Sequence, residues 1–163
     1  MSSIHRGPTP FPETWRLIKA EHADDAFAGE GARRGGGRWN SKGVRIVYTA
    51  GSLSLATLEV MVHIPFYSAL KNYACIPIDF DPNLSLSITI EDLPDNWKAD
   101  PTPQSVKEVG DRWIQNQESV ILKVPSVIIP VEYNFLINPS HPEFKKVVIH
   151  SPQKFAFDPR LLL

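Results

Sequence analysis

Fifteen prolines spread along 163 residues limit how long any helix or central strand of this chain can be. Proline lacks a backbone N–H and breaks the hydrogen bonding of a helix interior or a sheet. Apolar residues at helical spacing are also confined to short windows. The chain is therefore expected to form short strands and turns with a few helices, within one domain of ordinary size.

The pattern of apolar residues predicts six or seven strands and two or three helices. The strands are expected over residues 14–20, 44–49, 73–80, 84–90, 119–124, 127–131 and 145–150. The helices are expected over residues 53–63, with Leu55, Leu58 and Val62 on one buried face, from Thr102-Pro103 to about Gln115, and from Asp158-Pro159. Strands and helices do not alternate as in βαβ units. This order predicts an α+β fold with a mainly antiparallel sheet.

Bulk properties narrow the class of protein. Hydrophobic residues make up 42% and charged residues 21%, which favours a packed core over disorder. The net charge of -1 lacks the excess of positive charge that is typical of proteins that bind a nucleic-acid backbone. A single cysteine, Cys75, excludes an internal disulfide, and the five histidines lack metal-ligand spacing, so no metal site is expected. No stretch has the length of a membrane span, so a cytoplasmic protein is expected.

The polar, glycine-rich segment 21–43 reads as a long loop, and long ordered loops are usually functional. Its end, Gly35 to Gly43, carries Arg38 and leads into a buried strand. Such a loop is expected to direct backbone amides and a guanidinium at one anion. It is not a Walker loop, because Lys42-Gly43 has the reverse order and a strand follows. Its glycines also miss the Rossmann spacing.

Five residues form the candidate site: Arg16, Arg38, Tyr48, Glu59 and Ser119. Taken singly, each has an ordinary structural explanation as a solvated charge, a core aromatic or a strand-end hydroxyl. Together the five residues could bind and act on a nucleotide. Two arginines can bind a pyrophosphate, a tyrosine can stack on a flat ring, and a glutamate can stabilise a developing oxocarbenium ion.

Several sequence blocks are similar to those of one known family. They run in order over nearly the whole chain: Trp15-Arg16-Leu17, Gly29-Glu30-Gly31-Ala32, Gly36-Gly37-Arg38-Trp39-Asn40-Ser41-Lys42-Gly43, Val47-Tyr48-Thr49-Ala50, Leu55-Ala56-Thr57-Leu58-Glu59-Val60, Ser119-Val120-Ile121-Leu122, Val124-Pro125-Ser126, Asn134-Phe135-Leu136-Ile137-Asn138-Pro139 and Phe157-Asp158-Pro159-Arg160-Leu161. With these blocks the chain resembles the RES-domain toxins of bacterial type II toxin–antitoxin systems. The resemblance implies a RES domain over residues 14–163, preceded by an N-terminal arm over residues 1–13.

The resemblance also implies a fold and an activity. The fold would be like that of ADP-ribosyltransferase toxins, with a split sheet and a cleft for NAD. NAD would be a substrate and no cofactor would be permanently bound. The chain would cleave the nicotinamide–ribose bond by hydrolysis or phosphorolysis and arrest growth. Two alternatives remain open: a mono-ADP-ribosyltransferase that modifies a cellular protein, and a non-catalytic module that binds a nucleotide or phosphate.

Roles for individual residues follow from the same resemblance. Arg16 and Arg38 would hold the NAD phosphates, and Tyr48 would pack against the nicotinamide or its ribose. Glu59 would hydrogen-bond the ribose and stabilise positive charge, while Ser119 would position the ribose or the nicotinamide amide. Weaker candidates for supporting NAD contacts are Lys42 and Asn138.

The resemblance implies partners as well. A cognate antitoxin of the Xre/ParS/MbcA type would block the NAD cleft with its C-terminal end, and DNA would be bound only through that antitoxin. A homodimer within a larger complex is one of the assemblies left open. No membrane partner is expected.

Overall fold

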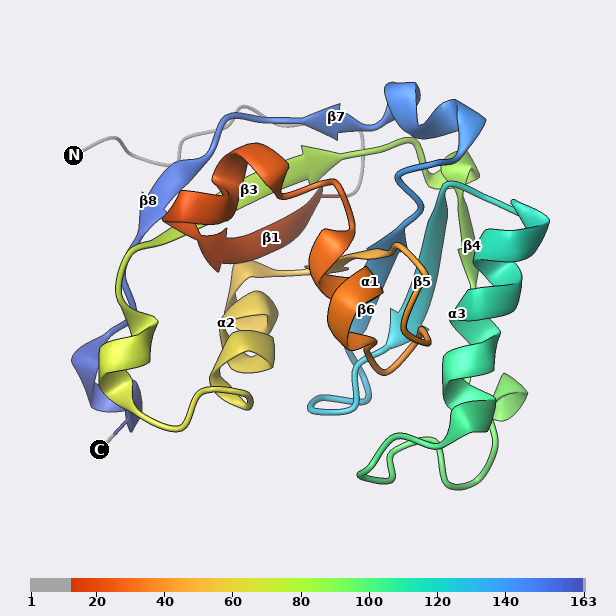
Figure 1. The fold of residues 1–163 in the computed structure, drawn as a ribbon, viewed down its shortest axis with the longest axis horizontal. Coiled ribbons are helices and arrows are strands. Elements are labelled where there is room, and N and C mark those ends of the chain that lie inside the picture. The colour runs from red at the N-terminus through yellow and green to blue at the C-terminus, as the bar shows by residue number, and fades with distance from the viewer. Residues whose placement is uncertain (1–12, 163) are drawn as a thin grey trace.

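The computed structural model describes residues 13–162 (Figure 1). The predicted arm, residues 1–13, lies outside the described residues except for Glu13, which begins the first strand. The strands are β1 Glu13–Lys19, β2 Val47–Ala50, β3 Tyr73–Asp79, β4 Ser85–Ser87, β5 Ile121–Pro125, β6 Tyr133–Ile137, β7 Val148–Ile149 and β8 Gln153–Phe155. The α-helices are α1 Glu30–Gly35, α2 Leu53–Met61 and α3 Gln104–Asn116. Short 3₁₀ turns are η1 Ala20–Asp25, η2 Tyr67–Leu70, η3 Pro82–Leu84, η4 Ile90–Asp92, η5 Pro142–Lys146 and η6 Pro159–Leu162.

All eight strands belong to one sheet, in the order β4-β5-β6-β2-β1-β3-β7, with β8 also paired to β3. Every pairing is antiparallel except that of β4 with β5. One residue pair, Trp15 with Ala50, joins β1 to β2, whereas β1 and β3 pair along their whole length. The sheet is therefore mixed but mainly antiparallel, and it is nearly divided between β1 and β2. This confirms the predicted α+β class.

The strand alternation places α2 and α3 on the same face of the sheet. Ala50 of β2 packs with Leu55 and Ala56 of α2. Leu136 of β6 packs in the cluster that contains Trp113 of α3. Because side chains two residues apart along a strand share a face, and Tyr48 pairs with Leu136 and Ala50 with Asn134, these positions all face the two helices. Figure 1 shows α2 and α3 separated, with α1 and its following loop between them.

Some local predictions are wrong. Segment 21–43 contains α1, in which Glu30 pairs with Arg33 one turn later. Residues 127–131 form a turn instead of a strand, because the Ser126 hydroxyl accepts the backbone N–H groups of Ile128 and Ile129 and bends the chain. The strand follows at β6.

The predicted buried face of the helix over 53–63 is also only partly right. Leu55 is 1% exposed, but Leu58 and Val62 are 36% and 57% exposed. The helix ends at Met61, so Val62 lies beyond its last turn. The sheet covers α2 near Leu55, and the residues that follow at helical spacing, Leu58 and Val62, are not buried by it.

Candidate functional site

Glu59 lies on α2, and two side chains from much later in the chain hold its carboxylate. The helix begins directly after β2, where the Ser52 hydroxyl accepts the N–H of Leu55 at 3.0 Å and caps it. Glu59 Oε1 accepts hydrogen bonds from Ser126 Oγ at 2.9 Å and from Asn134 Nδ2 at 2.7 Å. The carboxylate is therefore held through one of its two oxygens.

Ser126 has a hydroxyl with a fixed orientation. It is fully buried at the end of β5, and its Oγ accepts the N–H groups of Ile128 and Ile129, each at 3.1 Å. A hydroxyl has two acceptor sites and one proton. With both acceptor sites used, the single proton is directed to Glu59. Val124-Pro125-Ser126 belongs to a block that resembles the family, but the sequence alone predicts no role for Ser126.

Tyr48 is anchored through its hydroxyl to the glycine-rich loop. The hydroxyl accepts the N–H of Trp39 at 3.1 Å and donates to Asn40 Oδ1 at 2.6 Å. Burial raises the pKa of Tyr48 well above its usual value, so the phenol stays protonated. Gly37 is required beside it, because a Cβ at this position would lie 2.6 Å from the tyrosine oxygen.

Arg16 lies where the sheet is divided. Its Nη1 donates to the backbone carbonyl of Tyr48 at 2.9 Å. This side-chain bond joins β1 to β2 next to their single backbone pair, Trp15 with Ala50. Its Nε is buried and has no hydrogen-bond partner among the described residues. Burial lowers the pKa of Arg16 to about 10, so the side chain remains a cation at neutral pH.

Arg38 is half-buried and links the loop to the segment before α3. Its Nη1 donates to the carbonyls of Trp97 at 2.9 Å and Ala99 at 3.2 Å. Burial lowers the pKa of Arg38, and the carboxylates of Asp100 and Glu59 act in the opposite sense. Arg38 is therefore within electrostatic reach of Glu59.

Five backbone amides of the glycine-rich loop, which were expected to face an anion, bind acceptors of the protein. The amides of Gly36, Gly37 and Trp39 donate to Ala32 O, Asn40 O and Tyr48 Oη. Further along, the amides of Ser41 and Gly43 donate to Asp111 and Arg33. These donors are used inside the protein, since they fix the shape of the loop. The guanidinium of Arg38 is the group of this loop suited to an anion.

Three further predicted site residues make no contact with Glu59. Ser119 is buried, accepts Trp113 Nε1 at 2.8 Å and donates to Ile121 O at 2.6 Å. It precedes β5, whereas Ser126 follows it, which puts the two roughly 20 Å apart at the rise of a strand. Asn138, just after β6, accepts the N–H of Ser140, and Lys42 is exposed on the loop. The predicted roles of Lys42 and Asn138 in supporting NAD contacts stay predictions.

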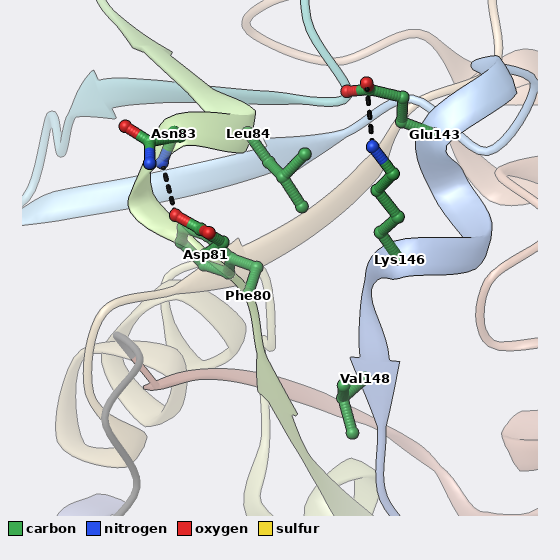
Figure 2. A pocket seen from close by; sticks show the side chains of 7 residues that line it. All are labelled: Phe80, Asp81, Asn83, Leu84, Glu143, Lys146 and Val148. Atoms are coloured by element: carbon green, nitrogen blue, oxygen red, sulfur yellow. Dashed lines mark hydrogen bonds and ion pairs between the residues drawn. The ribbon is translucent and has the colours of Figure 1, made fainter.

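Two cavities lie among the described residues. The larger, about 400 Å³, is lined by Phe80, Asp81, Asn83, Leu84, Glu143, Lys146 and Val148 (Figure 2). The dashed contacts there join neighbours within η3 and η5, so its polar groups already have local partners. The second, about 210 Å³, includes Pro125 and Tyr133, the residues next to Ser126 and Asn134. Neither contains Glu59.

Two kinds of feature are absent from residues 13–162. No group of three or more histidine, cysteine, aspartate or glutamate side chains is arranged to hold a metal there. None of the helices in this part of the chain is long and apolar enough to cross a membrane.

Comparisons with known proteins agree with this fold. Residues 13–158 match the model of the RES domain. "Toxin Res" of Yersinia enterocolitica is 37% identical over 148 residues, covering 90% of this chain and 97% of that protein. "Prs ADP-ribosylating toxin" of a Sphingobium species is 38% identical over 154 residues, covering 91% and 95%. A chain in the crystal structure of the M. tuberculosis MbcT–MbcA toxin–antitoxin complex has a TM-score of 0.73 at 18% identity, covering 90% of this chain and 85% of that one. By the extent of the family match and the identity of its relatives, this chain belongs to the RES domain family.

Proposed function

We propose that this protein is the toxin of a toxin–antitoxin system and that it consumes NAD by cleaving the nicotinamide–ribose bond. Membership of the RES domain family and relatives named "Toxin Res" support the first part. The anchored carboxylate of Glu59 carries the second. Among residues 13–162, its Oε1 has two donors and its Oε2 has none, which leaves one oxygen available to a ligand.

Glu59 would act on the charge that develops as the bond breaks. The electron pair of the C–N bond leaves with nicotinamide, which becomes neutral, and positive charge develops on the ribose. A carboxylate fixed before the reaction stabilises this charge without having to reorganise. Such a contribution is typically about 3–4 kcal/mol, which corresponds to roughly 100-fold or more in rate.

The other residues would bind and orient NAD. Arg16 and Arg38 would bind its phosphates, and both are cations close to Tyr48 of β2. The Tyr48 ring, held by its hydroxyl, would pack against nicotinamide or its ribose. Ser126, whose hydroxyl donates to Glu59, would orient the carboxylate.

A protein acceptor in place of water or phosphate is the second candidate. It is favoured by the relative named "Prs ADP-ribosylating toxin", because both reactions begin with the same bond cleavage. In that case ADP-ribose would be transferred to a cellular protein while bulk NAD is spared. The residues around Glu59 serve either reaction.

The proposed partner is an antitoxin that covers this site. The structural neighbour is a toxin in complex with its antitoxin. A C-terminal carboxylate of an Xre/ParS/MbcA-type antitoxin would suit Arg16 and Arg38. DNA would be contacted through the antitoxin, since the chain has a net charge of -1. The proposed location is the cytoplasm, where NAD is available.

The decisive experiment is to measure cellular NAD after brief induction of the chain alone, beside Glu59→Gln. Glu108→Gln is a matched control, because Glu108 is an exposed glutamate on α3. We expect NAD to collapse with the wild type and the control but not with Glu59→Gln. Growth arrest with unchanged NAD and ADP-ribose on cell protein would instead support transfer. NAD loss by Glu59→Gln at the wild-type rate would refute the role of Glu59, and neither arrest nor NAD loss would favour a binding module.

A further inference from the structure

Asn134 contacts Glu59 from a strand that is paired on both sides. It is the second residue of β6, paired with Ala50 of β2 on one side and Val124 of β5 on the other. Its Nδ2 donates to Glu59 Oε1 at 2.7 Å, the shorter of the two hydrogen bonds on that carboxylate. A side chain on a strand bonded on both sides has little freedom to move, so the donor is fixed relative to the sheet.

The other half of the Asn134 carboxamide has no hydrogen bond. Its Oδ1 is buried and has no partner among the described residues. Burying an acceptor in this way is unfavourable, and the great majority of buried polar atoms are paired. Turning the carboxamide over would place Oδ1 against the Glu59 carboxylate, which only accepts hydrogen bonds. The orientation seen therefore leaves one acceptor unpaired and keeps a donor on Glu59.

We propose that Asn134 is a positioning residue that, with Ser126, fixes the orientation of the Glu59 carboxylate in the candidate site. The inference rests on the proposed function, in which this carboxylate meets the ribose as the bond breaks. Both donors hold Oε1, so the direction of Oε2 is set by side chains from β6 and from the end of β5.

The test compares Asn134→Ala and Asn134→Asp with the wild type in purified protein. The first measurement is kcat and KM for NAD loss. The second is the mobility of the Glu59 carboxyl, followed by ¹³C NMR relaxation at one pH, which needs no activity. Gln153→Ala is a matched control, because Gln153 on β8 also has a buried oxygen without a partner but lies on the far side of β3.

In Asn134→Ala we expect kcat to fall by roughly 10-fold or more with little change in KM, and the Glu59 carboxyl to become more mobile, because a hydrogen bond to a charged group is lost. Asn134→Asp keeps the shape but replaces the donor with a second carboxylate, so kcat should fall at least as far. The Gln153 control should change neither measurement. Unchanged kcat, or lower activity with an unchanged mobility of the Glu59 carboxyl, would overturn the positioning role alone. A wild type that leaves NAD intact would refute the proposed function, and the NMR relaxation would still decide whether Asn134 holds Glu59.

Discussion

Gly110 allows α3 to lie directly against the loop that carries Arg38, so its replacement by alanine tests the packing beneath the candidate site. A Cβ at Gly110 would lie 1.8 Å from the carbonyl oxygen of Trp39 and 2.9 Å from its carbonyl carbon. Ordinary contacts begin near 3.4 Å. The helix and the loop would therefore have to separate by about 1.6 Å, the difference between 3.4 and 1.8 Å.

The size of the effect follows from two opposing terms. Overpacking a core costs about 1–3 kcal/mol and occasionally more, and the atom met here is backbone in a residue that is only 2% exposed. Alanine in a helix interior returns about 1 kcal/mol relative to glycine. Because a contact of 1.8 Å lies at the severe end, we expect Gly110→Ala to lose about 2 kcal/mol or more of unfolding free energy. For a chain of this length, that lowers Tm by roughly 4–8 °C.

Thermal and urea unfolding, followed by tryptophan fluorescence in a Glu59→Gln background, measure this effect. Gly31→Ala is the matched control, since Gly31 also lies in a helix but has nothing within 4 Å of a Cβ. The control should be as stable as the parent or up to about 1 kcal/mol more stable. A Gly110→Ala variant with the stability of the control would refute the close packing of α3 on Trp39.

Three further outcomes are expected. Tyr48→Phe leaves Asn40 Oδ1 without its donor, so unfolding free energy should fall by about 1–3 kcal/mol in urea titrations while the ring remains. Ser119→Ala should lower Tm, because the hydrogen bond to Trp113 is lost, but leave kcat for NAD loss unchanged. Ser126→Ala should lower kcat, because Glu59 loses a donor. The reverse pattern would contradict the assignment of the two serines. The arginines around Glu30 lower its pKa from 4.5 to about 2, so the stability difference between wild type and Glu30→Gln should be fully present above pH 4.5 and disappear as the pH falls to about 2; a constant difference in acid unfolding curves would argue against it.

The elements with a clear local signal could be predicted from the sequence. Strand β1, strand β3 and helix α3 have apolar spacing or a proline start that depends on neighbouring residues alone. The turn after β5 could not, because a run of valines and isoleucines resembles a strand. One buried hydroxyl, that of Ser126, overrides this preference by binding two amides.

The candidate site could be predicted only in part, because its contacts join residues that are far apart in the sequence. Arg38 lies within electrostatic reach of Glu59 and Tyr48, and Arg16 donates to the Tyr48 carbonyl, while the roles of these four residues toward NAD stay predictions. The residues that hold Glu59 come from 67 and 75 positions later in the chain, and strand pairing alone brings them to α2. Ser119, at the other end of the same strand, was predicted to position the ribose or the nicotinamide amide, and its hydroxyl bonds to Trp113 and Ile121.

The distance along the chain between Glu59 and its anchors has a consequence during protein synthesis. At about 5–20 residues per second, the 75 positions that separate Glu59 from Asn134 take roughly 4–15 s to translate. A nascent chain that ends at Lys123 already carries the arginines, the tyrosine and the glutamate of the candidate site, but neither side chain that holds the carboxylate. The assembled site therefore appears only with the last part of the polypeptide, and a chain released early leaves the ribosome without it.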